Sequence, residues 1–141
     1  MNLLLDTNVL SEVQRPVPSA KVVAWLDTID EDRAFISVAS IAELRRGIAL
    51  LEDGRRRTAL AAWLAHDLPA RFAERVLPID QTVAERWGDL MAQSRKSGVA
   101  LSVMDGFSAA TALVNDLTLV TRNVKDFAAF GVPLLNPWDG A

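Results

Sequence analysis

The sequence predicts an α/β protein with a central, mainly parallel sheet covered by helices on both faces. Short, continuous apolar runs, such as LLL at 3–5 and LTLV at 117–120, alternate along the chain with longer segments of helical periodicity. This alternation is typical of a parallel sheet. The 141 residues are half hydrophobic and contain no repeat or low-complexity tract. We therefore expect one domain over residues 1–141.

The first half of the chain contains two expected strands and several helices, each with a recognisable start or stop. The first short helix ends at Arg15-Pro16, because proline disfavours helical backbone in the residue before it. Ser19 can cap the second helix, Gly54 is a natural stop for the third, and Pro69 is expected to bend or end the fourth. The expected elements are a strand at 2–5, a helical turn or two at 7–14, a helix from Ser19 to about 29, a strand at 34–37, a helix at about 38–52 and a helix from about Arg57.

The second half continues the alternation. Either Asp80 or Thr82 can cap its first helix, which Gly98 ends. The next helix, VMDGFSAATALV, is rich in small residues, as a helix packed closely on a sheet would be. The expected elements are a strand at 75–79, a helix to Gly98, a linker at 99–102, a helix at about 103–114, a strand at 117–121, a polar turn with a short helix at 122–131 and a last strand within 133–138.

Composition excludes several kinds of chemistry. The chain has no cysteine, which excludes disulfides, thiolate metal ligands and cysteine nucleophiles. His66 is the only histidine, and no Ser-His-Asp arrangement can be built around it. No glycine-rich phosphate loop occurs, so no nucleotide cofactor is expected. There is no basic leader and no apolar run long enough to span a membrane, so we expect a cytoplasmic protein. With a net charge of −3, any nucleic-acid binding must be local.

Acidic side chains recur where the expected strands end. Asp6 follows the first strand directly, Glu43 lies in the helix after the second, and Asp105 opens a later helix. Asn123 and then Asp126 follow the strand at 117–121. Ligand sites of parallel sheets form beyond the carboxyl ends of the strands. Carboxylates from distant segments, without histidine or cysteine, suit a hard cation such as Mg²⁺ or Mn²⁺, which also relieves their mutual repulsion.

Each acid also has a structural explanation. Asp6 can cap the helix that begins at Thr7. The stretches SIAE, Ser40 to Glu43, and SVMD, Ser102 to Asp105, both have the form of a capping box or its aspartate variant. Taken one at a time, capping explains these residues at least as well as metal binding. Only their joint placement at one edge of the sheet favours chemistry.

Four blocks in order resemble a known family. LLLDTNVLSE, SVASIAELRRGIALL, VMDGFSAATAL and LTLVTRNVKDF, with the terminal NPW, are similar to the PIN-domain VapC toxin family, especially its FitB-like branch, over essentially the whole chain. The resemblance implies a three-layer α/β/α PIN-like domain. It also implies a Mg²⁺- or Mn²⁺-dependent endoribonuclease, a hydrolase that acts as the toxin of a type II toxin-antitoxin system.

The family's site residues fall on particular positions of this chain. The resemblance assigns catalytic roles to Asp6, Glu43, Asp105 and Asn123, with the metal held by Asp6 and Asp105 and, directly or through water, by Glu43. The family commonly has an acid where this chain has Asn123, which is a departure, and Asp126 could reach in from the next turn. The remaining expected residues are Thr7, Asn8 and Thr121 in supporting roles and Arg45, Arg46 and Arg122 as RNA or antitoxin contacts.

The resemblance also implies partners and leaves alternatives open. Expected partners are an RNA substrate, a second copy of the chain in a homodimer, and a DNA-binding VapB-like or FitA-like antitoxin in a heterotetramer or larger complex. One alternative is a nuclease-silent, FitB-like member of a DNA-binding regulatory pair. Another is a phosphatase of the haloacid dehalogenase type, which the Asp-x-Asn sequence at Asp6 disfavours because that family has a second aspartate there.

Overall fold

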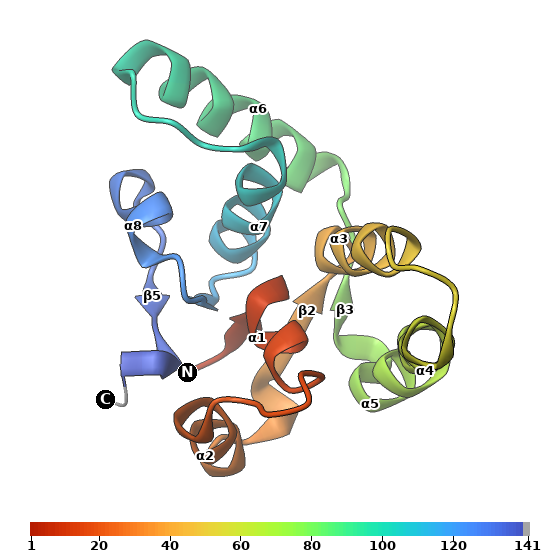
Figure 1. Ribbon diagram of the computed structural model, residues 1–141. Helices are drawn as coiled ribbons and strands as arrows, with labels where there is room; N and C mark the ends of the chain where they lie inside the picture. The colour runs from red at the N-terminus through yellow and green to blue at the C-terminus, as the bar shows by residue number, and fades with distance from the viewer. Residues whose placement is uncertain (140–141) are drawn as a thin grey trace.

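A five-stranded parallel sheet organises the protein, as the computed structural model of residues 1–139 shows (Figure 1). The strand order is β3-β2-β1-β4-β5, and every pairing is parallel. Central Leu4 pairs with Phe35 on one side and Leu119 on the other. The strands are β1 Leu3–Leu5, β2 Ala34–Ser37, β3 Val76–Leu77, β4 Thr118–Val120 and β5 Leu134–Leu135. The predicted parallel α/β class is confirmed.

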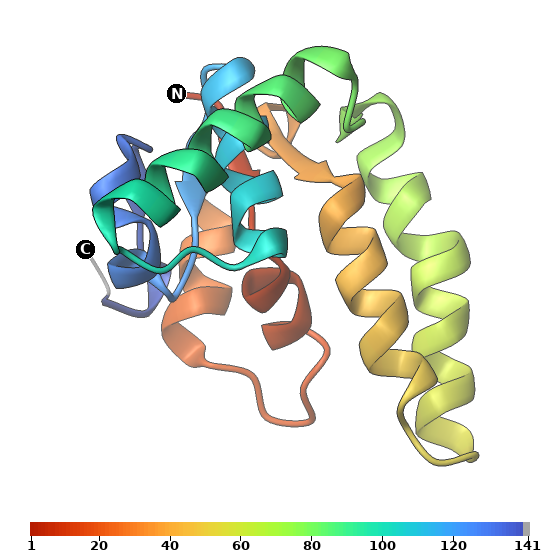
Figure 2. The same ribbon diagram turned by 90° about the horizontal axis from the view of Figure 1, so that it is seen from above.

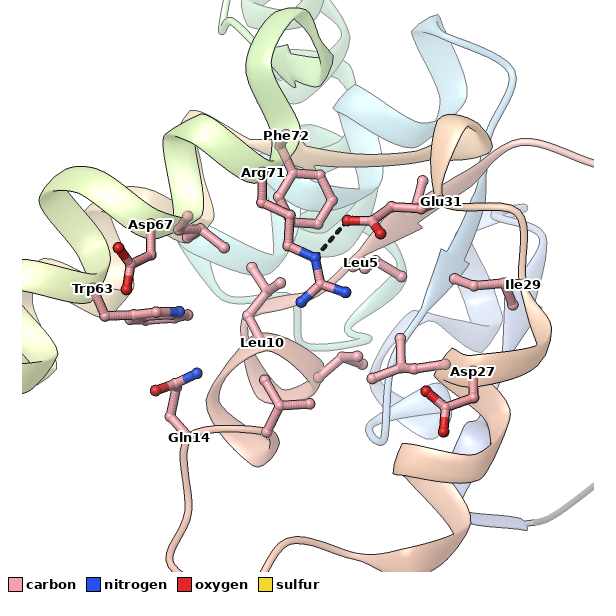
Figure 3. A pocket seen from close by; sticks show the side chains of 15 residues that line it. Leu5, Leu10, Gln14, Asp27, Ile29, Glu31, Trp63, Asp67, Arg71 and Phe72 are labelled. Atoms are coloured by element: carbon pink, nitrogen blue, oxygen red, sulfur yellow. Dashed lines mark hydrogen bonds and ion pairs between the residues drawn. The ribbon is translucent and has the colours of Figure 1, made fainter.

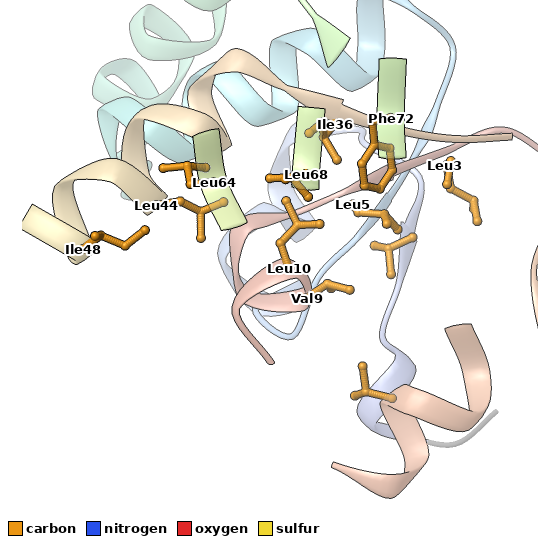
Figure 4. Close-up of a cluster of buried hydrophobic side chains, with 13 residues drawn as sticks. Leu3, Leu5, Val9, Leu10, Ile36, Leu44, Ile48, Leu64, Leu68 and Phe72 are labelled. Carbon is orange, nitrogen blue, oxygen red and sulfur yellow. The ribbon is translucent and has the colours of Figure 1, made fainter. Parts of the chain in front are cut away.

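Helices cover both faces of this sheet. Successive strand residues point to opposite faces, and the core accordingly divides into two clusters. Leu3, Leu5 and Ile36 pack with α1 to α5 (Figure 4), whereas Leu4 and Leu119 pack with α6 to α8. The helices are α1 Thr7–Glu12, α2 Ala20–Thr28, α3 Val38–Ala49, α4 Arg55–Ala62, α5 Leu68–Phe72, α6 Gln81–Ser97, α7 Val103–Val114 and α8 Val124–Phe127.

Two local predictions differ from the structure. The helix through Pro69 does not end there but continues to Phe72, because a π-helical segment, Trp63–Asp67, rewinds the hydrogen bonds just before the proline. The SIAE stretch is not a capping box. Helix α3 begins at Val38, as expected, with Ser37 as its N-cap accepting the amide hydrogen of Ala39 at 3.0 Å, so Ser40 lies inside the helix. Most other differences are shorter elements, but α4 begins two residues before the expected start, and a 3-10 turn at Pro137–Asp139 follows the short β5.

Helices α3 and α4 form an antiparallel hairpin that extends away from the sheet, with α4, the π segment and α5 running as one continuous rod beside α3 (Figure 2). On the opposite face α6 and α7 pack closely at Gly106. A Cβ there would lie 2.8 Å from the sulfur of Met91 and 2.9 Å from Nε1 of Trp87. Gly106, one of the small residues noted in this helix, is therefore required by the close approach of α6.

All described elements belong to or cover this one sheet. The expectation of one domain over 1–141 stays a prediction, since residues 140 and 141 lie outside the described residues. Within residues 1–139, no helix is both long enough and apolar enough to cross a membrane.

Candidate functional site

The carboxyl edge of the sheet brings the ends of β1, β2 and β4 together. Asp6 follows β1 and its amide donates to the carbonyl of Val120 at 2.9 Å, which fixes it beside the end of β4. Helix α3 starts directly after β2 and carries Glu43 on its second turn. Parallel pairing thus places the residues after these three strands at one edge, where ligand sites of such sheets form.

Asp6 is a buried carboxylate held by hydrogen bonds. Only 5% of the residue is exposed. One oxygen accepts the amide hydrogen of Thr7 at 2.9 Å and the other accepts the hydroxyl of Thr121 at 2.8 Å. Burial raises the pKa of Asp6 to about 6; these two hydrogen bonds oppose the shift, and the negative charges of Asp105 and Glu43 add to it. Asp6 is therefore the N-cap of α1. Its burial also makes the ionised form of the carboxylate less stable than it would be in water.

Thr7 joins Asp6 to Glu43. Its amide donates to Asp6, and its hydroxyl donates to Oε1 of Glu43 at 2.7 Å. The hydroxyl oxygen of buried Ser40 lies 3.0 Å from that of Thr7. Because a threonine hydroxyl has a single proton, which Glu43 accepts, the Ser40 hydroxyl donates to Thr7. Ser40 was absent from the predicted site, although its i, i+3 spacing from Glu43 places both on one face of the helix.

Asp105 approaches the edge from α7. The aspartate form of the capping box predicted at SVMD is present in part, since Ser102 accepts the amide hydrogen of Asp105 at 3.1 Å. Burial raises the pKa of Asp105, the Ser102 hydroxyl opposes the shift, and the charges of Asp126 and Glu43 raise it further. Asp105 and Asp126 therefore share one electrostatic environment. Within residues 1–139, however, no three acidic or histidine side chains lie close enough together to form a ready-made metal site.

Asn8 and Thr121 tie the first loop to the last. The Asn8 amide nitrogen donates to the Thr121 hydroxyl at 3.2 Å, and its carbonyl oxygen accepts the amide hydrogen of Arg122 at 3.2 Å. The Thr121 hydroxyl also accepts the amide hydrogen of Asn123 at 3.1 Å. The Asn123 side chain is exposed and makes no capping bond to α8. Of the predicted supporting residues, Thr7, Asn8 and Thr121 thus form one network around Asp6.

The guanidinium groups of the three predicted arginines lie outside this network, although the backbone amide of Arg122 takes part in it. Arg45 and Arg46 are exposed on α3. Arg122 is exposed, and its guanidinium carbon lies 5.3 Å from the ring centre of Trp138. A guanidinium stacked on an aromatic ring keeps its donors free in the ring plane. Arg122 lies two residues after the end of β4, and its backbone amide donates to Asn8, so its backbone is anchored to the network around Asp6.

The donor set fits a hard divalent cation. Asp6, Glu43 and Asp105 offer carboxylate oxygens, and Thr121 and Asn8 are oxygen-bearing neighbours; oxygen ligands are those that Mg²⁺ and Mn²⁺ prefer. Burial, more than the neighbouring acidic charges, raises the pKa values of Asp6 and Asp105, and a bound cation would stabilise the charged form of such carboxylates. The fold and site together define a small three-layer α/β protein with an acidic site at the carboxyl edge of its sheet.

The chain belongs to the PIN-domain family, since the family model described as PIN domain matches residues 3–132. It is 40% identical to Toxin FitB of Neisseria gonorrhoeae, over 96% of this chain and 98% of that protein. It is 37% identical to VapC ribonuclease Y4jK of Sinorhizobium fredii, over 99% of each. The crystal structure of FitAcB from Neisseria gonorrhoeae matches with a TM-score of 0.90 at 40% identity, covering 96% of this chain and 98% of that one. PIN-domain ribonucleases use a divalent metal ion.

Proposed function

We propose that this chain is a Mg²⁺- or Mn²⁺-dependent endoribonuclease of the cytoplasm and the toxin of a type II toxin-antitoxin system. The observation that carries the proposal is the junction at Thr7, which holds the carboxylates of Asp6 and Glu43 on one residue while Asp105 raises the pKa of Asp6 through its charge. The likeness to proteins named VapC ribonuclease and Toxin FitB supports the reaction class.

Residues of four segments would contribute to the reaction. Asp6, Asp105 and Glu43 would hold the divalent ion, which when bound polarises a phosphoryl oxygen and lowers the pKa of water. Thr7 and Ser40 orient the Glu43 carboxylate. Asn8 and Thr121 keep the two loops at a fixed spacing. Asn123 adds a polar group without a charge, and Asp126 supplies a fourth negative charge near Asp105.

The RNA would be guided by local positive charge. Arg45 and Arg46 on α3 and Arg122 after β4 carry exposed guanidinium groups, which bind phosphate oxygens in pairs. Because the molecule has a net charge of −3, these groups have to act at short range. RNA binding is therefore expected to weaken as salt is added.

A protein partner fits a cavity on the α1–α5 face. The cavity has a volume of about 460 Å³ and an apolar floor that includes Leu5, Leu10 and Phe72 (Figure 3). Asp27 and Asp67 line its rim, where Arg71 pairs with Glu31. Apolar walls with an acidic rim suit a short peptide that carries apolar and basic side chains. A DNA-binding antitoxin, VapB-like or FitA-like, is the proposed source of that peptide, in a complex built on a homodimer of this chain.

A second function is favoured by one residue. Asn123 stands where the family commonly has an acid, and the loss of one negative charge would weaken metal binding. A nuclease-silent partner in a DNA-binding regulatory complex is therefore the alternative, with the same antitoxin but no cleavage.

Incubating the purified protein with single-stranded RNA, structured RNA and a generic phosphate ester, each with Mg²⁺, Mn²⁺ or EDTA, separates these functions. The proposal expects metal-dependent cuts within RNA that Asp105→Asn abolishes, with Asp89→Asn, an exposed aspartate on α6, as the matched control. RNA that stays intact beside tight binding of the co-expressed antitoxin supports the alternative. Cleavage of the ester alone contradicts both.

A further inference from the structure

A second cavity opens from the carboxylate edge toward the α3–α4 hairpin. Its volume is about 260 Å³, and Thr7 and Glu43 line it. The remaining walls come from α1, α3, α4 and the start of the π segment. Thr7 and Glu43 therefore belong both to the acidic site and to the wall of this pocket, which is distinct from the cavity of Figure 3.

The interior of this pocket is apolar and partly aromatic. Leu44 and Ile48 line it from α3, and Leu60 and Trp63 line it from the opposite helix. Trp63 is only partly buried and begins the π-helical segment, a type of distortion that occurs frequently at functional sites. Aliphatic walls with an indole suit a flat aromatic ring, because every nucleobase has a face that stacks on an aromatic side chain.

The rim of the pocket carries positive charge. Arg15 and Arg56 line it, and both side chains are exposed. Arg15 pairs with buried Glu12 at 3.3 Å, and Arg56 has no ion pair within residues 1–139. Among residues 1–139, Glu43 is the one acidic residue that lines the pocket. A cationic rim favours a polyanion, whereas the acidic rim of the cavity in Figure 3 disfavours one.

We propose that this pocket binds one unpaired nucleobase of the RNA substrate, next to the phosphate that is cut, and that the enzyme consequently prefers single-stranded RNA with a particular base at one flanking position. The inference rests on the proposed function and deepens it. The pocket volume lies just below the roughly 300 Å³ at which sites for larger ligands begin, so it accommodates one base rather than a folded segment. Arg15 and Arg56 would bind the neighbouring phosphates.

Gly47 offers a test that spares the fold. It lines the pocket from within α3, and a Cβ at this position would meet no atom within 4 Å. Leucine is a better helix former than glycine, so Gly47→Leu fills the pocket without an expected loss of stability. Gly88 on α6 is equally open and exposed but does not line the pocket. Gly88→Leu is therefore the matched control.

The experiment measures cleavage of a pool of single-stranded RNA of random sequence with Mn²⁺, and sequencing of the fragment ends gives the base frequencies around each cut. We expect the unaltered protein and Gly88→Leu to show a base preference at one flanking position. Gly47→Leu is expected to lose that preference and to lower kcat/KM by roughly 5- to 150-fold, the range that one stacked base contributes. A Gly47→Leu protein that keeps both the preference and kcat/KM overturns the inference.

Two further outcomes separate this inference from the proposed function. If the unaltered protein cuts no RNA, the proposed nuclease function fails, and the pocket is tested instead by quenching of tryptophan fluorescence with the same RNA pool. Quenching that Gly47→Leu removes and Gly88→Leu keeps supports the base pocket, whereas equal quenching in all three proteins refutes it. If Gly47→Leu weakens only antitoxin binding and leaves the cleavage pattern unchanged, the pocket belongs to the partner and the inference is wrong.

Discussion

The buried carboxyl of Asp6 is expected to make the metal-free protein less stable as the pH rises from about 4 to above 6. Its pKa is about 6 in the folded protein against an ordinary value of 3.8, chiefly because of burial. Between these values the folded state binds more protons than the unfolded state, so the free energy of unfolding falls with rising pH. A difference of about two pH units, at about 1.4 kcal/mol each, amounts to about 3 kcal/mol.

Urea unfolding of the protein and of Asp6→Asn in EDTA, over pH 4 to 8, measures this effect. Asparagine stays neutral throughout, so the free energy of unfolding of the variant minus that of the parent isolates Asp6. Altered hydrogen bonds to Thr121 add an offset at every pH. We expect the difference to grow in favour of Asp6→Asn by about 2.5 kcal/mol between pH 4 and pH 8, because part of the full shift is already present at pH 4, while Asp89→Asn follows the parent. A difference that does not change with pH would refute the reasoning.

Three other changes have defined outcomes. Gly106→Ala puts a methyl group against Met91 and Trp87 and is expected to lower the free energy of unfolding by about 1–3 kcal/mol, whereas Gly88→Ala on the exposed face of α6 raises it by up to about 1 kcal/mol; urea unfolding of both variants checks this. Ser40→Ala removes the group that fixes the Thr7 hydroxyl and is expected to lower activity or Mn²⁺ affinity about 10- to 100-fold, measured by Mn²⁺ titration of RNA cleavage; an unchanged titration contradicts a positioning role. Asn123→Asp restores a charge beside Thr121 and is expected to improve apparent Mn²⁺ affinity about 5-fold, the effect of about 1 kcal/mol of added attraction, in the same titration.

Much of the fold could be predicted because local signals agreed with the tertiary structure. Ser19, Asp80 and Ser102 each cap the helix expected to follow them. Of the two expectations at Pro69, a helix end is wrong because the π-helical segment before the proline lets the helix continue to Phe72, and such a rearrangement depends on packing of the rod against α3 and the sheet rather than on a local pattern. The capping box expected at SIAE is absent for a related reason. Both Ser37 and Ser40 could cap a helix, and because β2 ends at Ser37, the helix begins directly after it.

The candidate site was only partly accessible to the same reasoning. Strand ends indicate which acids share an edge of the sheet, and this placed Asp6 near the segments of Glu43 and Asp105. Distances between side chains do not follow from sequence spacing, so the Thr7 junction and the role of Ser40 were not foreseen. The pocket at Gly47 depends on how the α3–α4 hairpin leans toward α1, which no short motif encodes.

The claim that Asp6, Glu43 and Asp105 act together as one metal-dependent nuclease site is tested most directly by the Mn²⁺ dependence of RNA cleavage. Initial rates on a single-stranded RNA are measured against Mn²⁺ concentration for the parent, Asp6→Asn, Asp105→Asn and the control Asp89→Asn, with folding verified by circular dichroism. The account predicts saturable, Mn²⁺-dependent cleavage in the parent and the control, and a loss of more than about 100-fold in the other two variants. Folded Asp6→Asn and Asp105→Asn proteins that cut RNA at the parental rate and Mn²⁺ dependence would contradict it.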